Sequence, residues 1–434
     1  MRKEINIRQV GVISSESKVQ TNLIQRAIES LGEDGGIVYF PAGTYVTGTL
    51  YLKSNVTLYF DNGARLWGSP NHEDYLGDYT GAIEAPSFSE CLIYAENADN
   101  IEITGFGTID GKGERFDGSK AFLKRPMLMR FINCRNVSFN KIHLKNAGSW
   151  GVHMISCEDI HINKVNLYSH VQHNNDGFDF DSCRNVFISD CKIDSSDDSI
   201  CLKSTTMQMC ENFVITNCIL SSDTATLKFG TSSLSGFKGV SVSNCVFHDC
   251  PMGTIKFMMV DGGLIDNINI SNIVMYNVGS PLFIRTGKRN LKYDKPAEMD
   301  FWGEGEKNDD KPGKIRNINI SDIRADVTVT EKDKTPIMIT GIPDSSVENI
   351  SLTNISVTFP GGGTKEDAKR VIAEDEYKYP EQWFFGILPA YALYARHVNG
   401  MTLKNISFDL KQADEREAFY FEDVKNLLTD GEKL

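Results

Sequence analysis

Hydrophobic and polar residues alternate in short segments that recur along most of the chain. The segments share the form x-N-[I/V]-x-[I/V/F]-x-[N/D], as in NCRNVSFNKIHL from residue 133, SCEDIHINKVNL from 156 and SCRNVFISDCKI from 182. A period of two is typical of β-strands, and the many β-branched residues favour strands as well. No amphipathic helix of useful length fits between the segments. The pattern therefore predicts many short strands separated by turns.

The segments repeat at a nearly constant distance. The aligned Asn, Asp or Gly residues fall at Asn136, Asp159, Asn185, Asn212 and Gly239, which gives steps of 23, 26, 27 and 27 residues. Short strands at such a period predict a solenoid of stacked coils. The L-x-x-L-x-L pattern of leucine-rich repeats is missing. We therefore expect an all-β solenoid that forms a single domain over 1–434, with coils from about 36 to 425.

Three segments depart from the repeat. Residues 19–31 (VQTNLIQRAIESL) have apolar positions at helical spacing and predict a short capping helix, within an N-terminal cap over about 15–35. Residues 286–313 and 360–390 are charged and rich in Gly and Pro, and we expect them to be loops inserted between coils. Such insertions often form the walls of a binding face, and Trp302 and Trp383 within them are candidate platforms for sugar rings.

Composition excludes several classes of protein. The 434 residues carry a net charge of −13, which argues against nucleic acid or an anionic membrane as the partner. No stretch approaches ~18 consecutive apolar residues, so no transmembrane helix is expected. The first residues, MRKEINIRQV, lack the apolar region of a signal peptide. Two interpretations remain open: a secreted or periplasmic protein whose leader is absent from this sequence, or a cytoplasmic protein.

Most of the ten cysteines fall at repeat positions. Cys134, Cys157, Cys183 and Cys210 share one position, and Cys191, Cys218 and Cys245 share another. We expect them to be small buried side chains stacked inside the solenoid, with disulfides as the alternative. No C-x-x-C pair exists, which argues against a zinc site.

The densest group of acids in the repeat spans residues 174–198. NNDGFDFDS and SSDDSICLKS align as consecutive coils, which places Asp176 one coil below Asp198, with Asp197 beside it. Adjacent residues at a bend between strands can both face a cleft. The alignment predicts three carboxylates within one or two strand spacings, each ~4.8 Å.

Such a cluster suits glycoside hydrolysis. The reaction needs a protonated acid at the leaving oxygen and an ionised carboxylate that activates water or attacks the sugar. Close like charges keep a proton on at least one group near neutral pH. Two alternatives remain: turn residues at coil corners, and a calcium site formed by Asp176, Asp179 and Asp181.

Four cations end similar apolar strands near the aspartates. Lys203, Lys228, Lys256 and Arg285 follow one another at steps of 25, 28 and 29 residues. If they are coil equivalents, they form one line of like charges, which repel unless acids neutralise them or an anionic ligand binds. Both explanations stay open, and all four residues are candidates for substrate binding.

Aromatic residues and histidines near the aspartates are further candidates. Trp150 lies one coil below and in register with Asp176, and His153 follows it in the sequence SWGVHM. Either ring could contact a sugar, and core packing is the alternative. His170 and His173 precede the aspartates and could support them from behind.

The chain resembles glycoside hydrolase family 28, the polygalacturonases and their relatives, over nearly its full length. The resemblance rests on the following matches: GGIVYFPAGTYVTGTLYLKSNVTLYFDNGARLWGSP (35–70) with the N-terminal coils, GTIDGKGERF (107–116) with G-T-I-D-G-x-G, Asn174-Asn175-Asp176 with N-T-D, Ser196-Asp197-Asp198 with G-D-D, and Ile255-Lys256 with the end of R-I-K.

This resemblance implies a right-handed parallel β-helix of the pectin-lyase-like kind that hydrolyses a pectic polysaccharide with inversion, possible exo action and no cofactor. By the same resemblance, Asp197 is the general acid, Asp176 and Asp198 position and deprotonate the water, and Asn174 lies among the substrate-binding residues. In inverting enzymes the acid and base lie roughly 6.5–9.5 Å apart.

The sequence departs from the family in two places. The histidine of G-H-G is absent from Ser222–Thr226, and Thr254 replaces the arginine of R-I-K. We still expect hydrolysis despite these departures. They put in doubt that the sugar at the scissile bond is galacturonate. A calcium-dependent polysaccharide lyase and a non-catalytic carbohydrate-binding β-helix are the competing functions.

Overall fold

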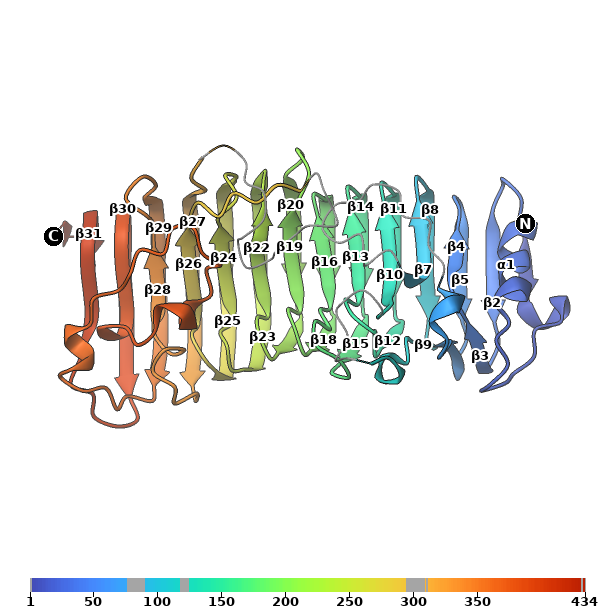
Figure 1. Ribbon diagram of the computed structural model, residues 1–434, viewed down its shortest axis with the longest axis horizontal. Coiled ribbons are helices and arrows are strands. Elements are labelled where there is room, and N and C mark those ends of the chain that lie inside the picture. Colours follow the sequence, from blue (N-terminus) through green and yellow to red (C-terminus); the bar gives the residue numbers. More distant parts are fainter. Residues whose placement is uncertain are drawn as a thin grey trace. The chain divides into compact units, whose positions relative to one another are not determined.

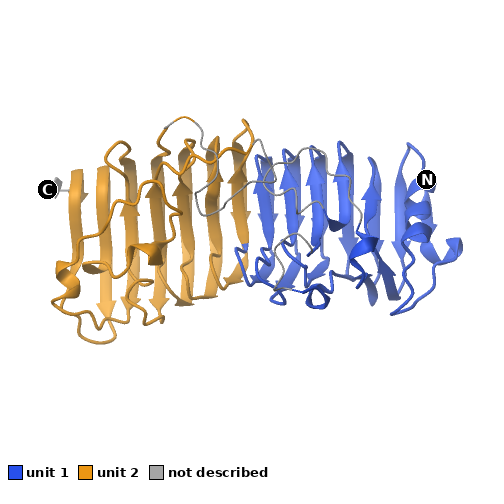
Figure 2. Ribbon diagram, viewed as in Figure 1, with its two compact units in different colours: residues 1–199 blue, residues 200–434 orange. Residues whose placement is uncertain are grey.

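A computed structural model describes residues 2–75, 90–117, 125–293, 309, 311–430 and 432–433. Contacts divide the chain into two compact units, residues 1–199 and 200–434 (Figure 2). Each unit is described by itself. Much of the predicted insertion at 286–313, including Trp302, lies outside the described residues.

The first unit consists of short strands in three parallel columns (Figure 1). The first column contains β1 (Glu4–Asn6), β2 (Gly36–Phe40), β5 (Val56–Phe60), β8 (Asp99–Gly105), β11 (Arg135–Asn140), β14 (Glu158–Asn163) and β17 (Arg184–Ser189). The second contains β3 (Gly43–Thr47), β6 (Ala64–Gly68), β9 (Thr108–Asp110), β12 (His143–Lys145), β15 (Asn166–Ser169) and β18 (Lys192–Ser195). The third contains β4 (Leu50–Leu52), β7 (Cys91–Glu96), β10 (Met127–Ile132), β13 (Val152–Ile155) and β16 (Phe178–Asp181). This arrangement is a parallel β-helix.

The alternation in the sequence places one face of each strand in the interior. In the first column, one row of directly opposed side chains is at most 1% exposed: Val38, Leu58, Ile103, Phe139, Ile162 and Ile188. Burying each such side chain contributes about 1.5–3 kcal/mol. The repeated apolar positions therefore form the core.

The repeated asparagines lie at the start of the first-column strands or just before it. Asn55, Asn100, Asn136 and Asn185 all have φ between 54° and 66°, a left-handed conformation that asparagine tolerates better than most residues. Their side chains also bond to one another, with the Nδ2 of Asn136 donating to the Oδ1 of Asn100 over 2.8 Å. The repeat position predicted from the sequence is thus a left-handed residue at the strand start, where geometry and hydrogen bonds both favour asparagine.

The predicted capping helix is present as α1 (Thr21–Ser30), two residues shorter at its start and one at its end than expected. It buries Ile24, Ala27 and Ile28, and Gln25 bonds to the backbone of Tyr51. The described residues of this unit also contain the short 3-10 helices η1 (Ile7–Val10), η2 (His72–Asp74) and η4 (Gly113–Arg115). No helix in the described parts of the chain is long and apolar enough to cross a membrane.

The second unit also consists mainly of parallel strands, several of them longer than those of the first. One column contains β19 (Ile200–Ser204), β22 (Leu227–Ser233), β24 (Ile255–Met259), β26 (Leu282–Thr286), β28 (Ile337–Thr340) and the first part of β30 (Ala390–Leu410). The other strands are β20 (Cys210–Thr216), β21 (Ile219–Ser222), β23 (Gly236–Cys250), β25 (Leu264–Val278), β27 (Lys314–Val327), β29 (Val347–Phe359), β31 (Glu417–Thr429) and β32 (Glu432–Lys433). The predicted insertion at 360–390 contains η7 (Asp367–Lys369) and η8 (Gln382–Phe385).

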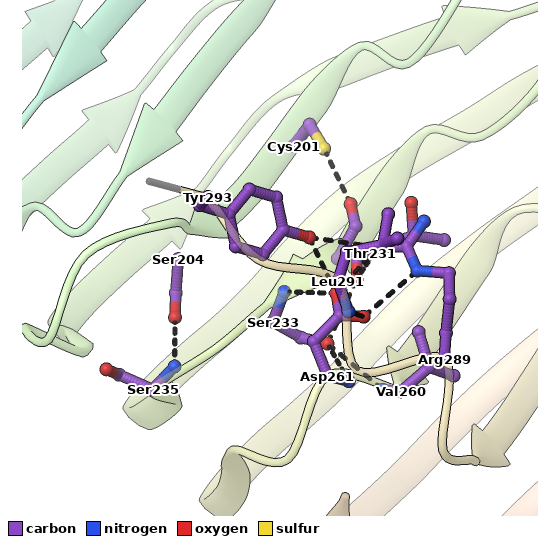
Figure 3. A network of polar contacts seen from close by, with 11 residues as sticks. Cys201, Ser204, Thr231, Ser233, Ser235, Val260, Asp261, Arg289, Leu291 and Tyr293 are labelled. Carbon is purple, nitrogen blue, oxygen red and sulfur yellow. Dashed lines mark hydrogen bonds and ion pairs between the residues drawn. The ribbon is translucent and has the colours of Figure 1, made fainter. Parts of the chain in front are cut away.

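A buried ion pair holds the segment that follows β26 (Figure 3). The carboxylate of Asp261 accepts hydrogen bonds from Arg289, at 2.6 and 3.0 Å, from the hydroxyl of Tyr293 at 2.7 Å, and from the backbone of Ser233 and Leu291. Burial opposes the charge on Arg289, but the carboxylate of Asp261 outweighs it and raises the pKa of the guanidinium. The network ties residues 289–293 to the coils beneath them.

All ten cysteines are buried thiols outside any disulfide. The backbone N–H of Cys134 lies 3.4 Å from the sulfur of Cys157, as expected for equivalent positions on stacked coils. Burial raises the pKa of the Cys91 thiol to about 12, which makes this thiol unreactive at neutral pH. The expectation of small buried side chains is confirmed, and the disulfide alternative is not.

Candidate active site

Three carboxylates meet at one corner of the first unit. Asp176 lies in the bend between β15 and β16, and Asp197 and Asp198 follow β18. One carboxylate oxygen from each residue lies within 4.8 Å of the others. The structure therefore brings together the three aspartates that the repeat alignment predicts to meet.

The three differ in exposure and in hydrogen bonding. Asp176 and Asp198 are buried, at 3% and 2% exposure, whereas Asp197 is partly exposed. The carboxylate of Asp197 accepts from the side-chain amide of Asn174 at 3.2 Å and from the backbone N–H of Asp198 at 3.0 Å. These two donors favour the ionised form of Asp197, and the neighbouring carboxylates favour a protonated form. Groups this close titrate as a unit.

A buried asparagine that the sequence did not single out as functional fixes the loop before the first aspartate. The side chain of Asn175 accepts from the backbone of Val171 and Gln172, and donates to the carbonyls of Ala147 and Ser149 at 2.9 and 2.8 Å. With all four bonds made, Asn175 holds the bend that carries Asp176. The position of Asn175 within the N-N-D motif is the sequence feature that could have identified this role.

Arg125 is a second residue that sequence reasoning missed. Its guanidinium donates to the Oδ1 of Asn174 at 3.3 Å and to the backbone carbonyls of His173 and Gly148. Burial lowers the pKa of Arg125. The residue belongs to no repeat unit and stands 49 positions before Asn174, so nothing in the sequence pattern marked it.

In the second unit, the four predicted cations do not form one ladder. Lys228 and Lys256 are directly opposed on β22 and β24, as expected. The prediction is wrong for the other two. Lys203 lies at a register shift of β19, and Cys201 is the residue opposite Lys228. Arg285 is opposite Met258, because the coil after Lys256 advances 27 residues to Phe283 rather than 29.

The two opposed lysines share an acid from the insertion at 360–390. The carboxylate of Glu381 lies 2.7 Å from the Nζ of Lys256 and 3.8 Å from the Nζ of Lys228. Lys256, Lys228 and Glu381 are 1%, 6% and 6% exposed. The acids expected to neutralise the cations were the nearby aspartates, and the sequence offered no sign of Glu381, which lies outside the repeat.

Arg285 also faces the insertion. It donates to the side chain of Thr340 and to the backbone carbonyls of Gly341 and Glu374. Burial and the nearby Arg396 lower the pKa of Arg285 to about 10, so it remains charged at neutral pH. At 1% exposure it anchors the insertion and has almost no surface for a ligand.

Comparison with known proteins identifies the family. The sequence matches the family model of glycosyl hydrolases family 28 over residues 75–375, well over half of the chain. The chain belongs to glycosyl hydrolases family 28. Residues 4–66 also match the family described as rhamnogalacturonase A/epimerase, pectate lyase-like.

Curated family 28 relatives align over part of their length. A probable polygalacturonase of Vitis vinifera is 33% identical over 210 residues, which are 45% of this chain and 43% of the relative. An exo-poly-alpha-D-galacturonosidase of Dickeya chrysanthemi is 26% identical over 46% of this chain and 41% of the relative. The chain thus spans less than half the length of these two relatives.

Solved structures agree on the fold. The family 28 exopolygalacturonase of Yersinia enterocolitica superposes with a TM-score of 0.77 at 19% identity, covering 100% of this chain and 79% of that one. This similarity confirms the predicted right-handed parallel β-helix.

The remaining candidates near the family 28 aspartates differ in exposure. Trp150 and His153 pack edge to face, 4.9 Å between ring centroids, and His153 is 0% exposed. A fully buried imidazole cannot contact a sugar, so the expected contact by His153 is not supported, and Trp150 is buried too. His170 bonds to Asp194 at 2.7 Å, and His173 contributes a carbonyl to Arg125. His170 is partly buried and His173 is exposed, so their support of the aspartates stays a prediction.

The calcium alternative predicted a different set of acids. Among the described residues, the group close enough to share a cation is Asp176, Asp197 and Asp198. Asp179 and Asp181 are buried on β16 and do not belong to that group. The predicted calcium set of Asp176, Asp179 and Asp181 is therefore not assembled.

Proposed function

We propose that this protein hydrolyses glycosidic bonds in a pectic polysaccharide by an inverting acid/base mechanism. The observation that carries the proposal is the cluster of Asp176, Asp197 and Asp198, with oxygens within 4.8 Å of one another. Glycoside hydrolysis needs one protonated and one ionised carboxyl group at the same bond. A corner with three acids provides both.

Electrostatics supports a retained proton in this cluster. Two unit charges 4.8 Å apart repel by about 3 kcal/mol at an effective dielectric constant of 20. Each hydrogen bond to a charged group contributes about 1.5–3 kcal/mol in the opposite sense. With three carboxylates there are three repelling pairs, so the fully ionised cluster is disfavoured.

The roles follow from exposure and from the family resemblance. Asp197 is the most exposed of the three and donates its proton to the glycosidic oxygen as the bond to the anomeric carbon breaks. Asp176 and Asp198, which are buried beside it, hold a water and take its proton as its oxygen attacks that carbon. Asn174 orients Asp197 through its amide.

The substrate class rests on the relatives. One is named a probable polygalacturonase and the other an exo-poly-alpha-D-galacturonosidase. The chain lacks the family's histidine and has Thr254 in place of its arginine. The names of the two relatives support our proposal of a pectic polymer as the substrate, and the name of the second supports exo action. We further propose, from the polymeric substrate, that the protein acts outside the cytoplasm, and fractionation of producing cells tests this.

Product analysis on defined pectic polymers tests the function. Hydrolysis releases new reducing ends without the ultraviolet absorbance of an unsaturated sugar, and EDTA has no effect. An absorbing product that EDTA suppresses identifies a calcium-dependent lyase. Binding without new reducing ends on every polymer identifies a non-catalytic β-helix. Monomer as the first product distinguishes exo from endo action.

A further inference from the structure

We propose that Arg125 is a positioning residue for the reaction and that it acts on Asp197 through the side chain of Asn174. The inference rests on the proposed function, because it takes Asp197 to be the general acid. All the residues involved lie in the first unit, so their contacts are those of one compact body.

The guanidinium of Arg125 bonds to two successive bends of the solenoid. Its Nη1 donates to the carbonyl of Gly148 at 3.3 Å and to that of His173, and its Nη2 donates to the Oδ1 of Asn174 at 3.3 Å. Gly148 lies in the bend before β13, and the other two acceptors lie in the bend before β16, one coil further along. Because a guanidinium is a rigid planar fork of donors, these bonds fix the Asn174 side chain relative to the preceding coil.

Arg125 is itself held in place. It is 4% exposed, and its backbone carbonyl accepts from the hydroxyl of Ser149 at 2.9 Å. The carbonyl of the next residue, Pro126, accepts from the backbone N–H of Gly148 at 2.9 Å. A guanidinium keeps its proton in proteins and has no acceptor atom. The fold therefore places a permanent donor at one end of the Asn174 amide.

This donor determines which end of the amide faces Asp197. The carbonyl oxygen and the NH2 group of an amide exchange places when it turns by about 180°. In the observed orientation, Oδ1 accepts from Arg125 and Nδ2 donates to the carboxylate of Asp197 at 3.2 Å. The opposite orientation would set the NH2 group against the guanidinium and the oxygen against the carboxylate. Both of those contacts are repulsive, so Arg125 and Asp197 together select the observed one.

The backbone of the same bend is held by a different residue. The side chain of Asn175 makes four hydrogen bonds to backbone groups of this bend and of the bend before it. None of these four bonds involves Arg125, so the bend should keep its course when the arginine is replaced. The amide of Asn174 would then lose the donor that orients it.

The orientation of Asn174 should set the acidity of Asp197. A donor to a carboxylate favours the ionised form, which opposes the effect of the neighbouring Asp176 and Asp198. Without an oriented donor, the pKa of Asp197 should rise, and the acid holds its proton more tightly. A weaker acid protonates the leaving oxygen more slowly. Loss of Arg125 should therefore lower kcat and leave KM nearly unchanged.

A double-mutant cycle of Arg125→Met and Asn174→Ala tests the inference. Each single substitution should move the basic limb of the kcat/KM profile up by about one pH unit, the effect of one hydrogen bond to a charged group. Because Arg125 acts through Asn174, the double variant should show no further shift. Additive shifts would mean that the two residues act on Asp197 separately and would overturn the proposal. An unmoved limb in Arg125→Met would overturn it as well.

Arg135→Met is the matched control. Arg135 is exposed on β11 of the same unit and bonds to Glu158 at 2.8 Å, so its loss should leave the profile in place. If Arg125→Met does not fold, Arg125→Lys serves, because lysine keeps the charge and loses the fork. The limb should still move in that variant. A profile of Arg125→Lys identical to that of the wild type would show that a charge suffices and would reject the positioning of the amide.

The titration can also be followed without catalysis. Carbon-13 NMR of the aspartate carboxyl groups reports on the cluster in the free protein, and the Asp197 signal is assigned by its loss in Asp197→Asn. The other titratable groups on or beside these bends are present in wild type and variant alike, so the difference between the two proteins reports the substitution: Asp176, Asp198, His170, His173 and Asp194.

The two readouts separate this inference from the proposed function. A carboxyl titration raised in Arg125→Met, with no hydrolysis of any pectic polymer by the wild type, would uphold the action of Arg125 on Asp197 and reject the proposed function. Hydrolysis by the wild type, with an unmoved carboxyl titration in Arg125→Met, would uphold the function and reject the positioning role.

Discussion

The side-chain amide of Asn174 connects Arg125 to Asp197. Its Nδ2 donates to Asp197 over 3.2 Å, and its Oδ1 accepts from Arg125 over 3.3 Å. A buried cation thus fixes which end of the amide faces the carboxylate. Asn174 is therefore oriented from behind to stabilise the ionised form of Asp197.

Replacing Asp197 with Asn should abolish most turnover and leave folding intact. Loss of a general acid typically costs about 10²–10⁴-fold in rate. The measurement is kcat on the best pectic substrate, with circular dichroism as a check on folding. Asp190→Asn is the control, since Asp190 is exposed and contacts Asn163 away from the cluster. Turnover by Asp197→Asn equal to that of the control would show that the acid is misassigned.

Replacing Asn174 with Ala should shift the pH dependence of the reaction. The substitution removes a donor that favours ionised Asp197, so the protonated form persists to higher pH. The basic limb of the kcat/KM profile should therefore move to higher pH. Asn136→Ala, at a repeat turn away from the aspartates, should leave the profile in place. An unmoved limb in Asn174→Ala would mean that the amide does not act on the acid.

The products should form with inverted configuration. The family resemblance predicts 6.5–9.5 Å between acid and base, yet the nearest carboxylate oxygens lie within 4.8 Å. This short approach makes the stereochemistry a decisive measurement. Proton NMR of the first-formed sugar gives the answer, and initial appearance of the retained anomer would reject the mechanism.

Arg289→Met should strongly destabilise the second unit. It leaves the carboxylate of Asp261 buried without its cation, a change that typically costs about 3–5 kcal/mol. Urea denaturation measures the loss, and Arg324→Met, at an exposed position, is the control. If Arg289→Met loses no more unfolding free energy than the control, the other hydrogen-bond donors to Asp261 are sufficient to stabilise its buried carboxylate.

Stability should depend on pH through Asp367. Burial works against its charge, but bonds from Lys332 and Thr364 prevail and lower the pKa of Asp367 to about 2. A carboxyl group with a depressed folded-state pKa stabilises the fold above its unfolded value of about 4, and the contribution is lost as pH falls towards 2. The gap in unfolding free energy between wild type and Asp367→Asn should therefore shrink between pH 6 and pH 3. A constant gap would contradict the depressed pKa.

The repeat made the fold and the carboxylate cluster predictable. Each segment specifies its own strand by alternation and its own turn by asparagine, so aligned segments such as those of Asn136 and Asn185 place their neighbours on stacked coils. The same alignment predicted that Asp176 lies close to Asp197 and Asp198, one coil further on.

What the repeat could not predict lies where it is interrupted. Lys203 falls at a register shift, which a count of residues between strands does not reveal. Glu381 belongs to an insertion without periodicity, and its contact with Lys256 spans 125 residues. Arg125 likewise reaches Asn174 from outside the repeat. Such contacts depend on how irregular segments return to the coils.

The contact between Glu381 and the two lysines joins an irregular insertion to the regular coils. The strands that carry Lys228 and Lys256 keep their register through backbone pairing alone, whatever the length of the segment that follows β29. The insertion nevertheless packs Phe385 and Leu388 against Met258 and Phe283 of the coils. Any segment exchanged at 360–390 must therefore supply both an acid for the lysine pair and apolar side chains for this cluster.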